Sequence, residues 1–331
     1  MWSKEEEKKQ KREKKMYVQP QQRTYYLLLM FRLFARRNYS IHWRFKDVCP
    51  SPRYDTGCTY CQPEFPTNLA IDFDKNLNKT GAIPTKHVMV LTNPINQISE
   101  LPSKTEFIPN SIPSEITKYR TMIQTDDQRV TISVIHLNNN RHQQILDQYN
   151  IKPGSSQQLV FLYPSMKIIR FDLSVLDQFV KKYLYSKPTA PVYNPFVQAK
   201  PSAPNNDLFD SIIVDESNFI EDELDKDLLV ICGHAKRDLR CGIIAPQLES
   251  EFNQVLVRHN LQDTIYTGQV SHVGGHAYAG NVLYYPKDCQ TSKDFIWYGR
   301  VFPKDVQGIV ELTIINKEII KDLFRGDIEA Y

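Results

Sequence analysis

Apolar and helical segments alternate through Leu228–Ile320 in an order that suits a small sheet covered by helices. Four runs have the apolar, β-branched and aromatic composition of strands: LLVIC, TIYTGQVS, NVLYYP and DFIWYGRVF. A helical segment, GIIAPQLESEFNQVLVRH, lies between the first two runs. A second, PKDVQGIVELTIINKEI, follows the last run and has its proline in the first turn. The order β-α-β-β-β-α therefore predicts a thioredoxin-like domain over residues 228–331.

A second mixed segment precedes this domain. The strand-like runs KHVMVLT, VTISVIHL and QLVFLY are followed by Leu173–Tyr185, whose apolar residues recur at helical spacing. Ser186–Asn206 then holds five prolines, and the acidic Asp215–Asp227 follows. A chain of 331 residues is long enough for two domains. We therefore expect an α/β protein with a Cys-containing mixed α/β domain (40–185), a Pro-rich and acidic linker (186–227) and the C-terminal domain (228–331). The first domain could share the thioredoxin-like plan in a degenerate form.

Positive charge is concentrated in the first residues of the chain. Residues 1–46 carry 13 Lys or Arg against 4 Glu, a net charge of +9, whereas the remainder carries 28 against 34, or −6. Such a mildly acidic body gives no sign of nucleic-acid binding. Met16–Lys46 contains no acid and surrounds the apolar run YYLLLMFRLFARR, a composition typical of a mitochondrial presequence. That run is too short for a transmembrane segment. We expect a presequence over residues 1–39, with a basic disordered leader as the alternative.

Two histidines flank a pair of glycines in SHVGGHAYAGN, residues 271–281. Adjacent glycines are poor helix formers and favour a turn with unusual backbone angles. We therefore expect His272 and His276 on a tight loop, and not on one face of a helix as in the HExxH zinc enzymes.

Cys232 ends the first predicted strand of the C-terminal domain, and Cys241 follows after eight residues. Because neighbouring strands end at the same edge of a sheet, these two thiols and the two imidazoles are expected to meet there. Soft ligands of this kind suit zinc or an iron–sulfur cluster. Zinc fingers usually place their cysteines closer and their histidines on a helix. His234, between the cysteines, is a minor candidate ligand, and Cys289 has no partner motif.

The spacing of Cys232 and Cys241, together with HVGGHAYAGN and YGRVFPKDV, resembles the fungal and bacterial sucrase/ferredoxin-like proteins. The similarity spans Leu228–Ile320 and extends more loosely to CPSPRYDTGCTYC and KHVMVLT. It implies that the C-terminal domain is a thioredoxin-like ferredoxin. It also implies that a 2Fe–2S cluster is bound by the two cysteines and two histidines of the motif, here Cys232, Cys241, His272 and His276.

Three further cysteines lie near the start of the expected N-terminal domain. Cys58-Thr-Tyr-Cys61 has the CxxC spacing that redox dithiols share with metal knuckles, and eight residues separate Cys49 from Cys58. One hypothesis is a redox dithiol, Cys58 and Cys61, with Cys49 as a resolving thiol. A metal site completed by a ligand from elsewhere and a reduced, buried structural cluster are the alternatives.

These features predict a mitochondrial 2Fe–2S protein that carries one electron. The sequence has no Gly-rich nucleotide motif and no Ser-His-Asp arrangement, so nothing indicates substrate turnover at the cluster. The resemblance also implies thiol redox control of other mitochondrial proteins through Cys58 and Cys61. A zinc-binding structural or interaction protein is the third interpretation. Redox proteins of the mitochondrial matrix or intermembrane space are the expected partners.

Overall fold

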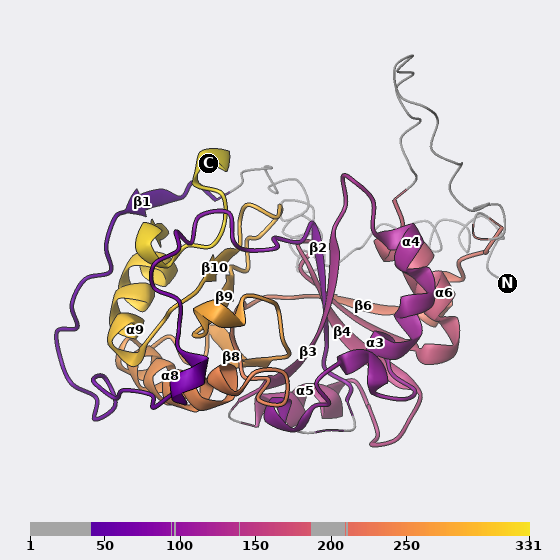
Figure 1. Cartoon of the computed structure of the whole chain (residues 1–331). Coiled ribbons are helices and arrows are strands. Elements are labelled where there is room, and N and C mark those ends of the chain that lie inside the picture. The colour runs from indigo at the N-terminus through magenta and orange to yellow at the C-terminus, as the bar shows by residue number, and fades with distance from the viewer. Residues whose placement is uncertain (1–40, 94, 96, 139, 187–208, 210) are drawn as a thin grey trace, which may run out of the picture. The chain divides into compact units, whose positions relative to one another are not determined.

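Strands from both expected domains join a single sheet in a computed structural model of the chain (Figure 1). The structure describes residues 41–93, 95, 97–138, 140–186, 209 and 211–331, so the expected presequence and residues 187–206 of the Pro-rich stretch lie outside the described residues. Within this part of the chain the sheet has the order β10-β9-β7-β8-β3-β2-β4-β5-β6. Its strands are β2 (Lys86–Val90), β3 (Val130–Leu137), β4 (Gln157–Tyr163), β5 (Lys167–Asp172), β6 (Ile220–Glu223), β7 (Asp227–Cys232), β8 (Ile265–Val270), β9 (Val282–Tyr285) and β10 (Ile296–Tyr298).

The two ends of the sheet repeat one pairing pattern. β7 pairs with β8 in parallel and with β9 antiparallel, and β10 pairs antiparallel with β9. In the same way β2 pairs with β3 in parallel and with β4 antiparallel, and β5 pairs antiparallel with β4. β3 and β8 join the two groups antiparallel. The mixed α/β class is confirmed. The division into two domains stays a prediction, because a continuous sheet neither requires nor excludes two folding units.

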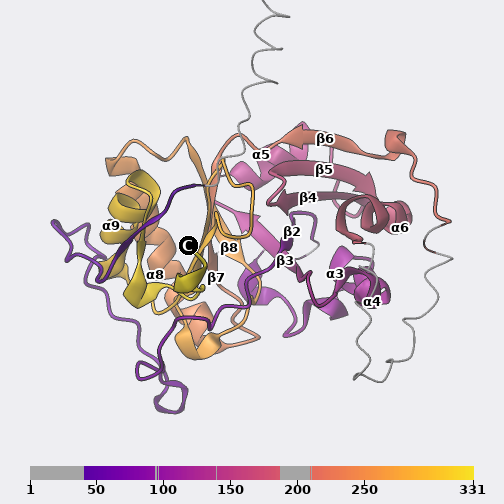
Figure 2. The ribbon, with the colours of Figure 1, turned by 90° about the horizontal axis from the view of Figure 1, so that it is seen from above.

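Helices lie beside each group of strands (Figures 1 and 2). The first group, made of β2, β3, β4 and β5, is accompanied by α3 (Ile112–Glu115), α4 (Arg120–Ile123), α5 (Arg141–Gln148) and α6 (Leu176–Phe179). The second group, made of β7, β8, β9 and β10, is accompanied by α8 (Leu239–Arg258) and α9 (Val306–Gly308). α6 continues as a π-helical turn over Val180–Leu184, and α9 over Ile309–Ile315. Among the described residues, no helix has both the length and the apolar character needed to cross a membrane.

Alternating side chains of the strands build different cores on the two faces of the sheet, because successive residues of a strand point in opposite directions. In β7, Leu229 and Ile231 pack with residues of α8 and α9. In β2, Val88 and Val90 pack with residues of α3 and α6. Each group of strands therefore has its own helix-covered face.

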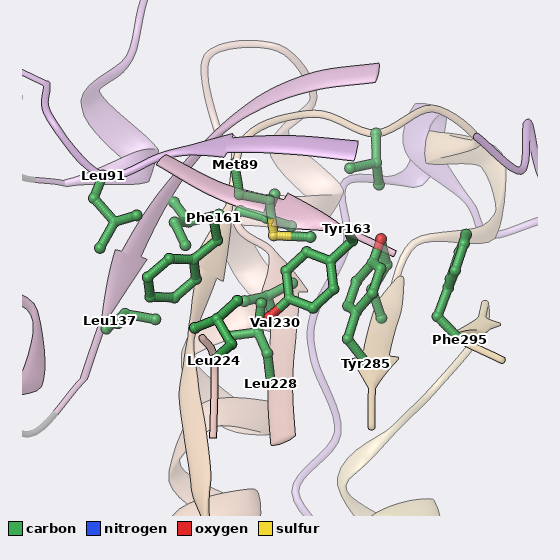
Figure 3. Packing of buried hydrophobic residues seen from close by; sticks show 14 of the residues in the cluster. Met89, Leu91, Leu137, Phe161, Tyr163, Leu224, Leu228, Val230, Tyr285 and Phe295 are labelled. Carbon is green, nitrogen blue, oxygen red and sulfur yellow. The ribbon is translucent and has the colours of Figure 1, made fainter. Parts of the chain in front are cut away.

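The opposite faces of the two groups share one core, shown in Figure 3. Met89 and Phe161 from the first group lie in the same cluster as Val230 and Tyr285 from the second. The ring centroids of Tyr163 and Tyr285 are 4.3 Å apart. This common core packs the two groups of strands against each other within the part of the chain that the structure describes.

Two segments lie where the sequence pattern gives no indication of them. β6 belongs to the acidic stretch expected in the linker, and it extends the sheet beside β5. The strand β1 (Arg44–Lys46) pairs in parallel with β11 (Glu318–Ile320), far away in sequence. As a result, the early cysteine segment, expected in the N-terminal domain, contacts the C-terminal helices; Arg53, for example, donates a hydrogen bond to Glu311 at 2.8 Å.

Candidate metal centre

The two cysteines of the motif are brought together by a strand end and a helix start. Cys232 ends β7 and is 1% exposed, and Cys241 lies in the first turn of α8 and is 0% exposed. Asp238 caps α8 by accepting a hydrogen bond from the backbone N–H of Arg240 at 3.1 Å, so the helix begins before the expected Gly242. A Cβ on Gly242 would lie only 2.4 Å from that of Ala235. The loop between the cysteines therefore folds back tightly.

His272 joins these thiols from the neighbouring strand. β8 runs parallel to β7 with Val270 opposite Cys232, so the residues after β8 lie beside the end of β7. Ligand atoms of Cys232, Cys241 and His272 all lie within 4.8 Å of one another. The structure thus brings together three of the four residues that the motif singles out.

His276 stands apart from this group of three. It is exposed, and its ring centroid lies 5.6 Å from that of His272 with the ring planes at 33°. Gly274 and Gly275 have φ of +97° and +74°, a backbone conformation that glycine tolerates best. The expected non-helical loop is confirmed, and a short 3₁₀ turn, His276–Tyr278, follows it.

His234 contacts the backbone of His272 and is not one of the three grouped residues. Its Nε2 lies 2.9 Å from the carbonyl oxygen of Pro102, and its Nδ1 accepts a hydrogen bond from the backbone N–H of His272 at 3.2 Å. Both ring nitrogens are therefore engaged. The spacing of the cysteines alone could not identify this role, since it depends on a loop distant in sequence.

The two thiols differ in acidity because they hydrogen-bond to each other, which lowers the pKa of one and raises the pKa of the other. Hydrogen bonding from Cys241, and then from His272 and the backbone of His234, holds the pKa of Cys232 well below its usual range. Hydrogen bonding to Cys232 and burial raise the pKa of Cys241. Two buried thiolates side by side require a positive charge between them, which a metal supplies.

A buried nitrogen of His272 supports the same interpretation. Within the part of the chain that the structure describes, Nδ1 of His272 is buried and has no hydrogen-bond partner. A buried polar atom left without a partner is costly, and a bond to a metal would satisfy it. Two thiols and imidazole nitrogen form a ligand set that suits zinc or an iron–sulfur cluster. The residues therefore fit a metal centre of this class.

The remaining cysteines lie outside the grouped residues, and all six are free thiols. Cys289 is buried, with its Sγ 3.5 Å from the carbonyl oxygen of Thr291. Burial raises the pKa of Cys49 to about 12, and its thiol donates to the carbonyl oxygen of Asp305. Cys58 and Cys61 form a turn in which the N–H of Cys61 donates to the carbonyl oxygen of Cys58 at 2.9 Å.

The chain belongs to the sucrase/ferredoxin-like family, whose model matches residues 77–326. Its relatives include proteins named altered inheritance of mitochondria protein 32. The Meyerozyma guilliermondii protein is 41% identical over 295 residues, covering 89% of this chain and 98% of that protein. The Clavispora lusitaniae protein is 39% identical over 284 residues, covering 85% and 95%. No solved structure gives a significant match. The family indicated by the sequence motif is thus confirmed.

Proposed function

We propose that this chain is a mitochondrial redox protein in which Cys232, Cys241, His272 and His276 hold a 2Fe–2S cluster. The observation that carries the proposal is that the two buried thiols of Cys232 and Cys241 lie beside the imidazole of His272, whose buried Nδ1 has no hydrogen-bond partner among the described residues. A bound cluster of this type would take up and release one electron. The protein's contribution is to hold the ligands, exclude water from the thiols and present one edge of the site to a partner.

The position of His276 favours a cluster over a single zinc ion. One ion draws its ligands around one point, whereas each iron of a 2Fe–2S cluster takes two of the four protein ligands. The exposed His276 lies outside the group formed by the other three residues. It would give electrons a short path between the cluster and a partner protein. A structural zinc site remains the alternative.

We further propose that residues 228–331 form a thioredoxin-like ferredoxin domain. The strand order β8-β7-β9-β10, with α8 between β7 and β8 and α9 after β10, supports this assignment. The order β3-β2-β4-β5 supports a related plan for the N-terminal half. The short helices there would make it the degenerate copy.

The mitochondrial assignment rests on two observations. The relatives carry a name that refers to the inheritance of mitochondria. The acid-free, Arg-rich composition of Met16–Lys46 independently suits a presequence. We propose redox proteins of the matrix or the intermembrane space as partners.

Substitution of the cysteines tests the ligand assignment. Cys232→Ser and Cys241→Ser should each lower bound iron and acid-labile sulfide by about tenfold or more, because a ligand is lost outright. Cys289→Ser, which alters another buried thiol, is the matched control and should leave both contents unchanged. Full iron and sulfide in Cys232→Ser protein would refute the assignment.

A second candidate function, thiol–disulfide exchange, is favoured by the contact between Cys58 and Cys61. The two cysteines share one turn, in which the backbone N–H of Cys61 donates to the carbonyl oxygen of Cys58 at 2.9 Å. The Cys61 thiol also influences Cys58, because burial and then hydrogen bonding with Cys61 raise the pKa of Cys58. Both side chains are partly exposed. The dithiol is therefore accessible to a partner's thiols, and it lies outside the grouped metal ligands.

A further inference from the structure

Arg325 is a buried arginine directed at the histidine loop. It is 1% exposed, and its guanidinium donates to the carbonyl oxygen of Gly274 at 3.1 Å and to the side-chain oxygen of Asn281. Two further bonds reach Thr80, one to its hydroxyl at 3.2 Å and one to its carbonyl oxygen at 2.8 Å. The guanidinium carbon lies 4.7 Å from the centroid of the Trp297 ring. One side chain thus ties the loop to a distant segment.

This buried cation has no acidic side chain as a partner among the described residues. Burial lowers the pKa of Arg325 to about 10, and attraction to Tyr278, Cys232 and Cys241 opposes that change. A buried charge is stable only when hydrogen bonds and opposite charge offset its desolvation. The hydrogen bonds to Gly274, Asn281 and Thr80 supply part of that offset, and they hold the positive charge against the loop that carries His272 and His276.

The same contact explains the second glycine of the loop. A Cβ on Gly275 would lie 2.2 Å from Nη2 of Arg325, and the φ of Gly275 is +74°. A Cβ on Gly274 would meet nothing within 4 Å. The first glycine is therefore required by its backbone angle alone, whereas the second also leaves room for the guanidinium.

We propose that Arg325 is a positioning residue of the metal centre, whose hydrogen bonds hold the His272–His276 loop and whose charge stabilises the reduced centre. The part that concerns reduction rests on the proposed 2Fe–2S function. When a one-electron donor protein reduces the centre, one negative charge is added and no bond is made or broken. A fixed positive charge in a buried environment favours that added electron.

Substitutions at Arg325 in the full-length holoprotein test the charge. Anaerobic titration with dithionite should show that, at the potential where the wild type is half reduced, the ratio of reduced to oxidised centre falls at least tenfold in Arg325→Met. This change corresponds to about 59 mV for one electron. Arg325→Lys, which keeps the charge, should stay within threefold. Arg300→Met is the matched control, because Arg300 lies over the same Tyr278 ring at 5.3 Å but bonds to the carbonyl oxygen of Lys75.

Two results would overturn the role of the charge. One is an Arg325→Met protein that holds its full iron and has the same ratio of reduced to oxidised centre as the wild type. The other is an equal fall of this ratio in Arg325→Met and Arg325→Lys. If Arg325→Met does not fold, Arg325→Gln replaces it in the comparison with Arg325→Lys, and the same two results decide.

Hydrogen–deuterium exchange of the metal-free protein separates the positioning role from the proposed function. Amides of residues 273–281 should exchange at least tenfold faster in Arg325→Met than in the wild type, and at the wild-type rate in Arg300→Met. Unchanged exchange in Arg325→Met would overturn the positioning role. If the purified wild type contains no iron and residues 273–281 still exchange faster in Arg325→Met than in the wild type, the 2Fe–2S function is refuted and the positioning role stands.

Discussion

Individual buried polar residues show where this molecule is structural and where it is functional. His87 in β2 is fully buried with both ring nitrogens occupied, because Nδ1 lies 2.7 Å from the hydroxyl of Tyr285 and Nε2 lies 2.8 Å from that of Ser133. His272, in contrast, keeps a buried nitrogen without a partner among the described residues. The first is a structural link between the two strand groups, and the second is a candidate ligand.

The burial of His87 predicts sensitivity to acid. Burial lowers the pKa of His87 to about 3, below the ~6.5 of an exposed histidine, so the folded protein holds it neutral. As the pH falls from about 6.5 toward about 3, His87 is protonated in the unfolded chain but stays neutral in the folded protein. The free energy of unfolding should therefore decrease by up to ~1.4 kcal/mol per pH unit in that window.

Urea unfolding of His87→Gln as a function of pH measures this contribution. The variant should be less stable at neutral pH by about 1–3 kcal/mol, because it loses buried hydrogen bonds. Its free energy of unfolding should nevertheless fall less steeply below about pH 6.5, because only the wild type has a His87 whose protonation in the unfolded chain favours unfolding. His259→Gln alters an exposed histidine and serves as the control. Equal slopes for the wild type and His87→Gln would show that His87 does not titrate on unfolding.

Among the structural elements, the segment that carries the CxxC motif makes a separate prediction. Burial, followed by hydrogen bonding with Cys61, raises the pKa of Cys58 to about 12, so its alkylation at neutral pH should be slow. Mild oxidation should nevertheless join Cys58 and Cys61 in a disulfide that a reductant removes, as mass spectrometry of alkylated peptides would detect. Cys58→Ser with Cys61→Ser should abolish this species and leave the visible absorption unchanged. Tightly bound zinc that disappears in the double variant would favour a structural site instead.

Local elements were predictable from the sequence because their apolar runs are long and regular. β2, β3, β7 and β8 coincide closely with their expected runs, and the glycine pair correctly excluded a helix around His272. The candidate ligand motif was recognisable from spacing because Cys232 ends one strand and His272 comes just after the neighbouring strand.

Long-range placement was not predictable in this way. β1 pairs with β11, although Arg44–Lys46 has no alternation of apolar residues from which a strand or its pairing partner could be predicted. β6 is an acidic, mostly exposed edge strand, so its composition indicated a linker. Arg325 lies outside the motif, and a single arginine near the end of a chain carries no local signal. Asn281, which receives its hydrogen bond, was visible only as the last residue of HVGGHAYAGN.

For the whole molecule, the N-terminal leader predicts where the protein acts. Deletion of residues 1–39 should leave the protein in the cytosol, because the acid-free, Arg-rich stretch is removed. Deletion of residues 1–15 alone removes only the mixed-charge run and should preserve import. Cell fractionation with each version measures the outcome. Mitochondrial accumulation of the 1–39 deletion would show that the targeting information lies elsewhere.

The most direct test of the metal centre is the spectrum of the full-length protein purified without oxygen. A 2Fe–2S cluster on Cys232, Cys241, His272 and His276 predicts a brown protein with about two iron and two sulfide per chain. Dithionite should bleach its visible absorption and produce the electron paramagnetic resonance signal of one unpaired electron per cluster. A colourless protein that carries one zinc per chain and no sulfide would contradict the account.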